Sequence, residues 1–220
     1  MSLSSRTDRE LFDAWTRGDS EAAGELFERH FDAIDRFFRN KVIDNYDDLV
    51  QQTFTACLES RDRFRGDSAF RTYLFAIANN ILRSHFRARR RDQDRFDWTQ
   101  VSACDVAPGP STMLRDRREQ QLLLESLRRI PLDYQVVLEL YYWEELTGAA
   151  IGEVVGLSEN TVRSRLRRGK QLLEAQMSEL ASDPAELART LQDLDCWARS
   201  IHDGVVTDSP ASGEPVGERD

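Results

Sequence analysis

One short stretch in the second half of this 220-residue chain, GLSENTVRSRLRRGK at residues 156–170, combines polar side chains with a cluster of cations. Between Thr161 and Lys170 there are five basic residues and no acidic one. Arginine at this density binds phosphates, and it can also donate two parallel hydrogen bonds to the edge of a guanine. The stretch therefore has the chemistry of a nucleic-acid contact, although the whole chain is acidic, with a formal net charge of −9.

The order of residues in this stretch predicts a helix with two different faces. Gly156 favours a turn, and Ser158 is a good N-cap. The small and apolar residues share one side, which we expect to pack inward: Val162, Leu166, Gly169 and Leu173. The opposite side is polar and basic: Asn160, Ser164, Arg167, Arg168 and Gln171. Three cations lie along the edges, where the phosphates beside a major groove would run: Arg163, Arg165 and Lys170.

A shorter helix, which Thr147 is placed to cap, precedes the turn at Gly156, so the pattern is that of a helix-turn-helix. In such a motif the second helix enters the major groove of DNA. The alternative is an ordinary amphipathic surface helix. Those usually interleave acids with bases, however, and no acid occurs here between Glu159 and Glu174. We therefore interpret the stretch as a DNA-recognition helix.

Charge is also distributed unevenly in the rest of the chain. From Arg61 to Arg91 nine arginines face two acids, whereas from Glu174 to Asp220 eleven acids face three arginines. Two basic segments inside an acidic chain indicate two local contact sites for a polyanion.

Apolar periodicity predicts helices nearly throughout and no convincing strand. Thr7 opens a capping box at the first helix, a third helix follows Asn45, and Ser68 is placed to cap a long fourth one. The second and third helices each carry an apolar stripe that we expect to face inward: Leu26, Phe27, His30, Phe31, Ile34, Phe37 and Phe38, then Val50, Phe54, Cys57 and Leu58. In the second half, Asp133 is placed to cap a further helix.

Periodicity is lost between about Arg91 and Ser111, where two prolines and a glycine indicate a linker. We therefore predict an all-α fold of two small helical domains, residues 7–91 and 113–176, joined by a flexible linker at 92–112. The linker is acidic, so it either occupies a channel normally used by nucleic acid or simply tethers the domains.

An acidic extension, residues 177–220, follows the second domain. The start Asp183-Pro184 predicts a helix over about 183–202, and we expect the tail beyond it to be disordered. Three roles are open for this helix: enlarging the core of the second domain, covering a basic or partner-binding face of the chain, or docking another protein.

Composition and motifs argue against several functional classes. No run approaches the roughly 18 apolar residues that a membrane span needs, and no signal-peptide pattern is present, so we expect a cytoplasmic protein without membrane insertion. Cys57, Cys104 and Cys196 are far apart and no histidine clusters with them, so we predict no disulfide framework, metal site or cofactor. No nuclease-type carboxylate cluster, P-loop or nucleophile motif occurs, so we predict no catalytic residues and no enzymatic activity.

Two long segments carry a family resemblance. PLDYQVVLELYYWEELTGAAIGEVVGLSENTVRSRLRRGKQLL resembles the domain (sigma-4) that binds the −35 promoter element in the extracytoplasmic-function (ECF) group of sigma-70-type sigma factors. YDDLVQQTFTACLESRDRFRGDSAFRTYLFAIANNILRSHFRARRR is similar to that group's sigma-2 domain, which binds core RNA polymerase and the −10 element. The resemblance covers roughly Leu11 to Ala175. It implies a transcription initiation factor that binds core RNA polymerase, directs it to specific promoters and helps open the DNA.

The resemblance also implies roles for three groups of residues. A contact with core RNA polymerase is implied for Asp48, Leu49, Gln51, Gln52 and Phe54. Contacts with the −10 element are implied for Phe64, Arg65, Asp67, Ser68, Asn80, Arg83, Ser84 and Arg87. Contacts with the −35 element are implied for Asn160, Thr161, Arg163, Ser164, Arg165, Arg167, Arg168 and Lys170.

The loop FRGDSAF has the chemistry that capture of a single flipped base requires. Phe64 offers a ring for stacking, Arg65 a cation for phosphate, and Asp67 or Ser68 a hydrogen-bonding group for a base edge. The alternatives are a loop that only turns the chain and, for the helix with Asp48, a plain amphipathic helix.

One departure from the family pattern is Gly152, which stands in the first helix of the helix-turn-helix where relatives commonly carry alanine. Glycine there costs up to about 1 kcal/mol of helix stability, so we expect a less stable helix. The alternative function is a free-standing helix-turn-helix transcriptional regulator, for which the first half shows no receiver, ligand pocket or dimer helix. The resemblance also allows for an anti-sigma factor as a partner.

Overall fold

The computed structural model describes residues 6–64, 68–89, 102–103 and 118–181. The rest of the chain lies outside the described residues, including Arg65, Asp67, most of the predicted linker and the whole predicted helix over about 183–202. Within the described ranges there are eight α-helices, one 3₁₀ turn and no strand, which confirms the all-α class.

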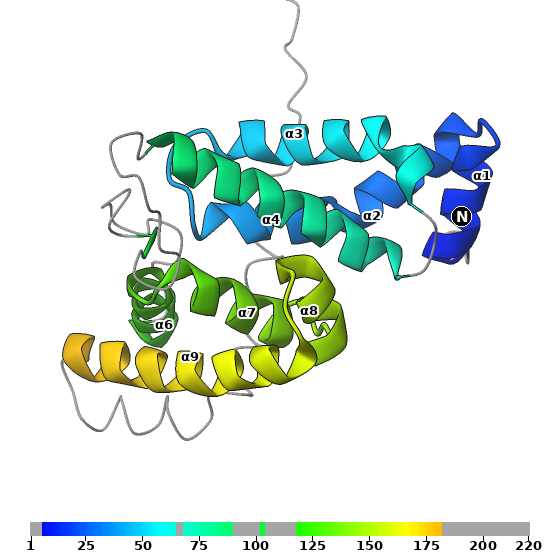
Figure 1. Ribbon diagram of the computed structural model, residues 1–220. Helices are drawn as coiled ribbons and strands as arrows, with labels where there is room; N and C mark the ends of the chain where they lie inside the picture. The colour runs from blue at the N-terminus through cyan, green and yellow to red at the C-terminus, as the bar shows by residue number, and fades with distance from the viewer. Residues whose placement is uncertain (1–5, 65–67, 90–101, 104–117, 182–220) are drawn as a thin grey trace, which may run out of the picture.

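The first domain is a bundle of four helices, coloured blue to green in Figure 1: α1 (Asp8–Thr16), α2 (Ser20–Arg39), α3 (Tyr46–Glu59) and α4 (Phe70–Arg89). The predicted start at Thr7 is confirmed as a complete capping box. Its hydroxyl accepts from the N–H of Glu10 at 3.3 Å, and the Glu10 carboxylate accepts from the N–H of Thr7 at 2.7 Å. Because α4 begins at Phe70, Ser68 lies one position before its N-cap site.

The second domain also has four helices: α6 (Arg118–Arg129), α7 (Leu132–Tyr142), α8 (Gly148–Val155) and α9 (Glu159–Leu180). Both predicted caps of the helix-turn-helix are confirmed. The Thr147 hydroxyl accepts from the N–H of Ala150 at 3.2 Å, and the Ser158 hydroxyl accepts from the N–H of Thr161 at 3.3 Å. Gly156 turns the chain between α8 and α9 with φ of 73°, a conformation that favours glycine.

The two domains lie against each other, with α4 packed along α8 (Figure 1). One buried apolar cluster runs through both, and includes Phe75 and Leu82 of α4 as well as Ile151 and Val154 of α8. Two residues of the predicted linker, Ser102 and Ala103, are buried, and Ser102 forms an isolated β-bridge with Pro131. The predicted helical domains therefore share part of their core.

Three side chains lie elsewhere than periodicity predicts. Phe31 and Leu58, expected to face inward, are each 49% exposed. The apolar stripes of α2 and α3 are wider than the surface on which these helices meet, so one residue of each stripe stays at the surface. Asp133 does not cap α7, because the N-cap is Pro131; its carboxylate pairs instead with Arg83 and Arg165.

Candidate nucleic-acid and polymerase interface

One side of α9 packs on the rest of the second domain, and this packing determines which side of the helix is exposed. Val162 and Leu173 are buried, and Gly169 lets α9 approach α7 closely. A Cβ at position 169 would lie 3.2 Å from the Leu138 side chain. As predicted, the polar and basic residues on the opposite side are all exposed: Asn160, Ser164, Arg167, Arg168 and Gln171. The helix thus presents hydrogen-bonding groups and cations to the surface on a rigid scaffold.

The turn before α9 explains the unusual glycine in α8. A Cβ at Gly152 would lie 2.6 Å from the carbonyl oxygen of Leu157, and the Leu157 N–H donates to the Gly152 carbonyl at 2.9 Å. Since a real Cβ does not approach an oxygen so closely, only glycine fits this turn. The expectation of a less stable helix stays a prediction, but the residue that lowers helix propensity is also the one that permits the tight turn.

The edge cations of α9 are held to different degrees. Arg163 is 69% exposed and donates to the Glu159 carboxylate at 2.6 Å, a surface pair that DNA phosphates can replace at small cost. The Lys170 ammonium lies 5.7 Å from the centre of the Tyr142 ring. Arg165 is only 19% exposed and is bound to Asp133 at 2.6 Å. Thr161, at the start of α9, is exposed.

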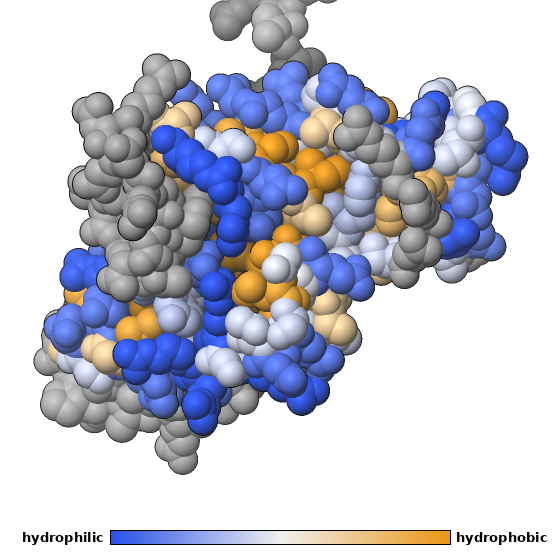
Figure 2. Space-filling view, in the orientation of Figure 1, coloured by the Kyte–Doolittle hydropathy of each residue, from blue (hydrophilic) through white to orange (hydrophobic). Residues whose placement is uncertain are grey.

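The predicted −10 surface lies beside an open groove of about 590 Å³ between α3 and α4. Figure 2 shows apolar surface there, in the centre of the first domain. Asn80 and Ser84 line the groove and are exposed, and Arg87 is exposed one turn further on. Arg83 differs, because its guanidinium is bound to Asp133 at 3.1 Å.

His85 lines the same groove without adding charge to it. Burial lowers the pKa of its imidazole, and the nearby Arg89 lowers it further. Its buried Nε2 atom has no hydrogen-bond partner among the described residues. The ring is therefore neutral near pH 7, and electrostatic attraction of DNA at this face falls to the arginines.

The structure places Phe64 in an aromatic cluster. Its ring centre lies 4.6 Å from that of Phe12, 4.8 Å from Tyr73 and 6.0 Å from Phe70. Ser68 is partly buried at the far end of the loop, and Arg65 and Asp67 lie outside the described residues. Stacking of Phe64 on a flipped base stays a prediction, and the ring clearly has a packing role as well.

The predicted polymerase surface on α3 is part polar and part apolar. Asp48, Gln51 and Gln52 are exposed, but Leu49 is only 4% exposed, so it supports the surface from below instead of forming it. Phe54 is half-buried, and its ring stacks with Phe31 at 6.0 Å.

Next to these polar residues lies an open apolar groove of about 310 Å³, lined by Phe27, Phe31, Asp47, Val50, Gln51, Phe54, Thr55 and Leu58. Only Gln51 and Phe54 of this groove belong to the predicted polymerase contact, and its exposed apolar members Phe31 and Leu58 were expected to face inward. The available signal was the unusual width of the two apolar stripes, which exceeds what one helix–helix contact covers.

Long-range ion pairs form a second feature that the sequence did not reveal. Asp133 joins Arg83 of α4 to Arg165 of α9, and Glu144 binds Arg36 of α2 at 3.1 Å. The partners of these pairs are up to 108 residues apart in the chain, so no local pattern indicates them.

Thiol reactivity, metal binding and membrane insertion were also considered for the described residues. Burial raises the pKa of the Cys57 thiol to about 12, so this thiol is protonated and unreactive near neutral pH. Among the described residues, no group of three or more His, Cys, Asp or Glu side chains is placed to hold a metal ion. No helix in the described part of the chain has the length and apolar character to cross a membrane.

Comparison with known proteins agrees with this geometry. The family model "Sigma-70 region 2" matches residues 26–92, and "Sigma-70, region 4" matches residues 120–173. The chain belongs to the ECF group of sigma-70-type sigma factors. The region 2 match ends in the basic segment after α4, and the region 4 match of this sigma factor contains α7, α8 and α9 as far as residue 173.

Relatives are similar along nearly their whole length. The ECF RNA polymerase sigma-E factor of Haemophilus influenzae is 28% identical over 183 residues, 79% of this chain and 97% of the relative. The RNA polymerase sigma-H factor of Pseudomonas aeruginosa is 29% identical over 189 residues, 81% and 97% of the two chains.

Two solved structures share the fold of this sigma factor. One is CnrH in complex with the cytosolic domain of CnrY, with 25% identity, a TM-score of 0.58, and coverage of 79% of this chain and 99% of CnrH. The other is the sigma factor RpoE in complex with the anti-sigma factor NepR from Bartonella quintana, with 21% identity, a TM-score of 0.56, and coverage of 72% and 98%.

Proposed function

We propose that this sigma factor binds core RNA polymerase, directs it to promoters with specific −10 and −35 elements, and helps open the DNA. The proposal rests on the different surfaces that the two domains expose. The second domain presents an exposed polar and basic face on α9, while the first domain carries a groove of mixed polar and apolar lining between α3 and α4 and a separate, mainly apolar groove between α2 and α3.

Within the second domain, Arg167, Arg168 and Ser164 would contact base edges of the −35 element in the major groove, because they lie at the centre of the exposed face. Asn160 and Thr161, at the helix start, would contact bases or the adjacent backbone. The edge cations would bind phosphates: Arg163, Arg165 and Lys170. These contacts supply affinity for any sequence and orient the helix.

Within the first domain, Asn80 and Ser84 would contact bases of the −10 element, with Arg83 and Arg87 holding its backbone. The loop from Phe64 to Ser68 would hold one flipped base. Polymerase would bind α3 through the exposed Asp48, Gln51 and Gln52 and through the apolar groove that includes Phe31, Phe54 and Leu58. Gln52 also lines the groove between α3 and α4, so the two proposed surfaces meet at this residue.

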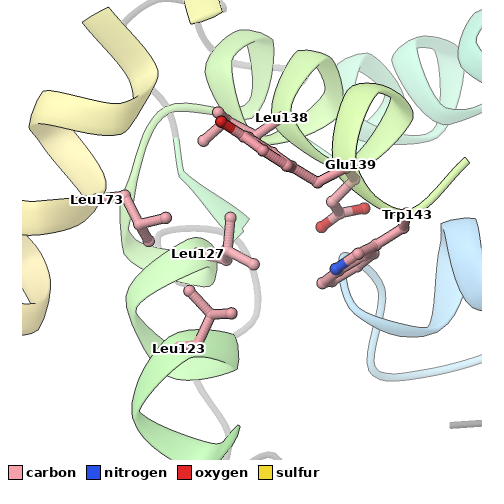
Figure 3. Close-up of a pocket in the computed structure, with 7 residues that line it drawn as sticks. Leu123, Leu127, Leu138, Glu139, Trp143 and Leu173 are labelled. Carbon is pink, nitrogen blue, oxygen red and sulfur yellow. The ribbon is translucent and has the colours of Figure 1, made fainter. Parts of the chain in front are cut away.

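A ligand-responsive regulator would need room for an effector. In the second domain, the cavity shown in Figure 3 has a volume of about 20 Å³, the space of roughly one water molecule. Its walls are mostly leucines of α6, α7 and α9, with Glu139 and Trp143 at the side. This cavity therefore leaves no room for an effector inside the second domain.

Sigma factors as a family are not enzymes. We infer that polymerase performs the catalysis and that this chain acts in the cytoplasm beside it. An anti-sigma factor is a further proposed partner, because RpoE was solved with one and CnrH with the cytosolic domain of CnrY.

The function is tested by reconstituted transcription. The full chain is added to bacterial core RNA polymerase with a pool of promoter fragments, and transcripts are sequenced. We expect start sites that depend on the chain and share two sequence elements upstream. Retention of core polymerase on the immobilised chain is measured in parallel. A chain that binds DNA but neither retains polymerase nor changes its start sites would be a free-standing regulator.

The polymerase surface is tested by three exposed substitutions. We expect Asp48→Arg, Phe31→Ser and Leu58→Ser to weaken retention of core polymerase, because they change the charge or the apolar character of the surface on α2 and α3. Tyr141→Ser is the matched control, since Tyr141 is a large exposed side chain of the second domain outside every predicted contact. Helix content measured by circular dichroism should be the same in all four. Equal retention by all four variants would show that this surface does not bind polymerase.

A further inference from the structure

The outer face of α9 carries positive charge that its surroundings do not neutralise. Arg167 and Arg168 are both exposed, and no carboxylate in the described part of the chain pairs with either of them. Arg168 donates to the neutral Gln171 at 3.2 Å. Arg163 lies four residues before Arg167, so two like charges lie on neighbouring turns and repel each other. This face therefore favours a negatively charged partner even before DNA is present.

The chain beyond α9 has the opposite charge. Residues 182–220, called here the C-terminal segment, lie outside the described residues and contain nine acidic residues and three arginines. The region 4 match ends at residue 173, before this segment. The sigma-E and sigma-H relatives match along 97% of their own length but cover only 79% and 81% of this chain. The C-terminal segment is therefore an addition to the two domains that these relatives share with this sigma factor.

The C-terminal segment begins close enough to reach the outer face of α9. Helix α9 ends at Leu180, and the backbone of Ala181 is extended, with φ of −66° and ψ of 127°. Arg168 lies 13 positions before Ala181, which is about 20 Å along the helix at ~1.5 Å per residue. An extended chain spans that distance in about six residues. Carboxylates from Asp193 onward can therefore reach Arg168, and the short tether gives them an effective concentration in the millimolar range.

The other basic helix offers a poorer site for this segment. Three of the four arginines of α4 already pair with carboxylates: Arg71, Arg83 and Arg89. On α9, Arg167 and Arg168 have no carboxylate partner among the described residues, and the C-terminal segment is joined directly to this helix. Charge and connectivity therefore both favour α9.

We propose that the C-terminal segment binds the outer face of α9 in the free chain and competes there with promoter DNA. This inference rests on the proposed function, because it gives the DNA-binding face a second, intramolecular ligand. Carboxylates of the segment pair with Arg167 and Arg168, in the place that DNA takes in the promoter complex. Exposed ion pairs are individually weak and are screened by salt. The segment therefore reduces binding of the free chain to DNA, and it is displaced once polymerase holds the promoter beside α9.

The contact is tested by nuclear magnetic resonance on the full chain, with a spin label on Cys196 inside the segment. Cys104 is replaced by serine, while Cys57 can stay because its buried thiol is unreactive. We expect the label to broaden the backbone amide signals of residues 163–171 in the free chain. The broadening should decrease at high salt and when promoter duplex is added. Broadening confined to the last turn of α9, beside the tether, would overturn the proposal, and so would broadening centred on α4.

Mixing two preparations identifies which chain supplies the segment. One chain carries the spin label and the other carries the isotope label, so broadening in the mixture reports contact between separate molecules. We expect none at residues 163–171. Broadening there in the mixture would assign the contact to a second copy of the chain and would contradict an intramolecular contact.

Charge substitutions separate docking from mere tethering. The test variant replaces four acids of the segment by amides: Asp193→Asn, Asp195→Asn, Asp203→Asn and Asp208→Asn. The matched control makes the same change in net charge at four exposed acids of the two domains: Glu21→Gln, Glu28→Gln, Glu145→Gln and Glu153→Gln. The test variant should lose the broadening at residues 163–171, and the control should keep it. Equal broadening in both would show that the carboxylates do not hold the segment on α9. Circular dichroism checks that both variants stay helical.

Competition is measured as the affinity of each free chain for a labelled promoter duplex without polymerase. If the segment covers the face for about nine-tenths of the time, the test variant should bind about tenfold more tightly than the control, because apparent affinity scales with the uncovered fraction. The difference should shrink as the salt concentration rises. Equal affinities of the two variants would contradict competition with DNA. Failure of the proposed function looks different: transcription start sites would not depend on the chain, while the broadening on α9 would remain.

Discussion

Helices α4 and α9 are the two basic helices on which promoter recognition is proposed to depend, and the structure treats them differently. Helix α9 packs one face on α6, α7 and α8 and leaves the opposite face exposed. Helix α4 is covered by α3 on one side and by α8 of the other domain on another. Side chains on the outer face of α9 can therefore change without affecting the fold, whereas changes around α4 alter packing and DNA contact together.

The largest expected effect is at the loop that leads into α4. Phe64→Ala removes a half-buried ring from contact with Phe12, Phe70 and Tyr73. We expect the free energy of unfolding to fall by about 3 kcal/mol, near the lower end for a truncated core phenylalanine. The measurement is urea denaturation of the full chain, followed by circular dichroism. A change below about 0.5 kcal/mol would mean that the ring is effectively at the surface, as exposed substitutions usually show.

Phe64→Leu separates packing from stacking at the same position. Leucine keeps most of the apolar volume, so its cost in stability should stay below about 1.5 kcal/mol. If the ring also stacks on a flipped base, open-complex formation should fall on a duplex promoter, and fall less on a template already melted at the −10 element. Equal loss on both templates would assign Phe64 to packing alone.

Next in size is the turn between α8 and α9. Gly152→Ala should destabilise the chain by about 2–3 kcal/mol, because its Cβ would meet the Leu157 carbonyl oxygen at 2.6 Å. The matched control is Gly24→Ala in α2, where a Cβ meets nothing within 4 Å. The control should stabilise the chain by about 0.5–1 kcal/mol through helix propensity. Thermal melting of both variants gives the comparison; a stabilised Gly152→Ala would show that the turn relaxes easily.

Features that depend on neighbouring residues were predicted from the sequence, whereas features that depend on contacts between distant helices were not. The caps at Thr7, Thr147 and Ser158 and the inner face of α9 follow from local spacing, and the structure confirms them. Asp133 was misplaced because a helix-start position and an ion-pair position look alike along the chain, and its partners lie 50 and 32 residues away on other helices.

Burial on α2 and α3 was predicted only in part, for a related reason. Periodicity shows which side of a helix is apolar, but the width of the neighbouring helix decides how much of that side is covered. Phe31 and Leu58 stay exposed, while Leu49, assigned to the polymerase contact, is buried. Gly152 was judged by helix propensity alone, although a contact with the backbone of Leu157, in the turn after the helix, decides which residue fits there.

Substitutions on the outer face of α9 should change which −35 sequences are preferred, without lowering the stability of the chain. Arg168→Ala and Ser164→Ala remove exposed groups from the centre of this face. Each should cost about 1–3 kcal/mol of discrimination at one position of the −35 element. Binding of the polymerase-bound protein to a library of −35 variants measures the change, with Ser178→Ala, at an exposed serine of α9 outside the predicted contacts, as the control. If every sequence lost affinity equally, these residues would contact only the backbone.

The smallest effects are expected from the edge cations of α9, and they refine the comparison with α4. Arg163→Ala should weaken binding to all sequences alike and reduce the slope of log affinity against log salt by about 0.9, the value for one phosphate contact. Arg163 pairs with the exposed Glu159 at the surface, so DNA phosphates can replace this partner in the free chain. Arg165→Ala should give the same slope change in the polymerase-bound protein but a smaller one in the free chain, because Asp133 already holds that guanidinium. Salt titrations of both variants in both states give four slopes. Identical changes for Arg163 and Arg165 in the free chain would show that the contact with Asp133 does not compete with DNA, and that α9 is as independent of α4 electrostatically as it is in packing.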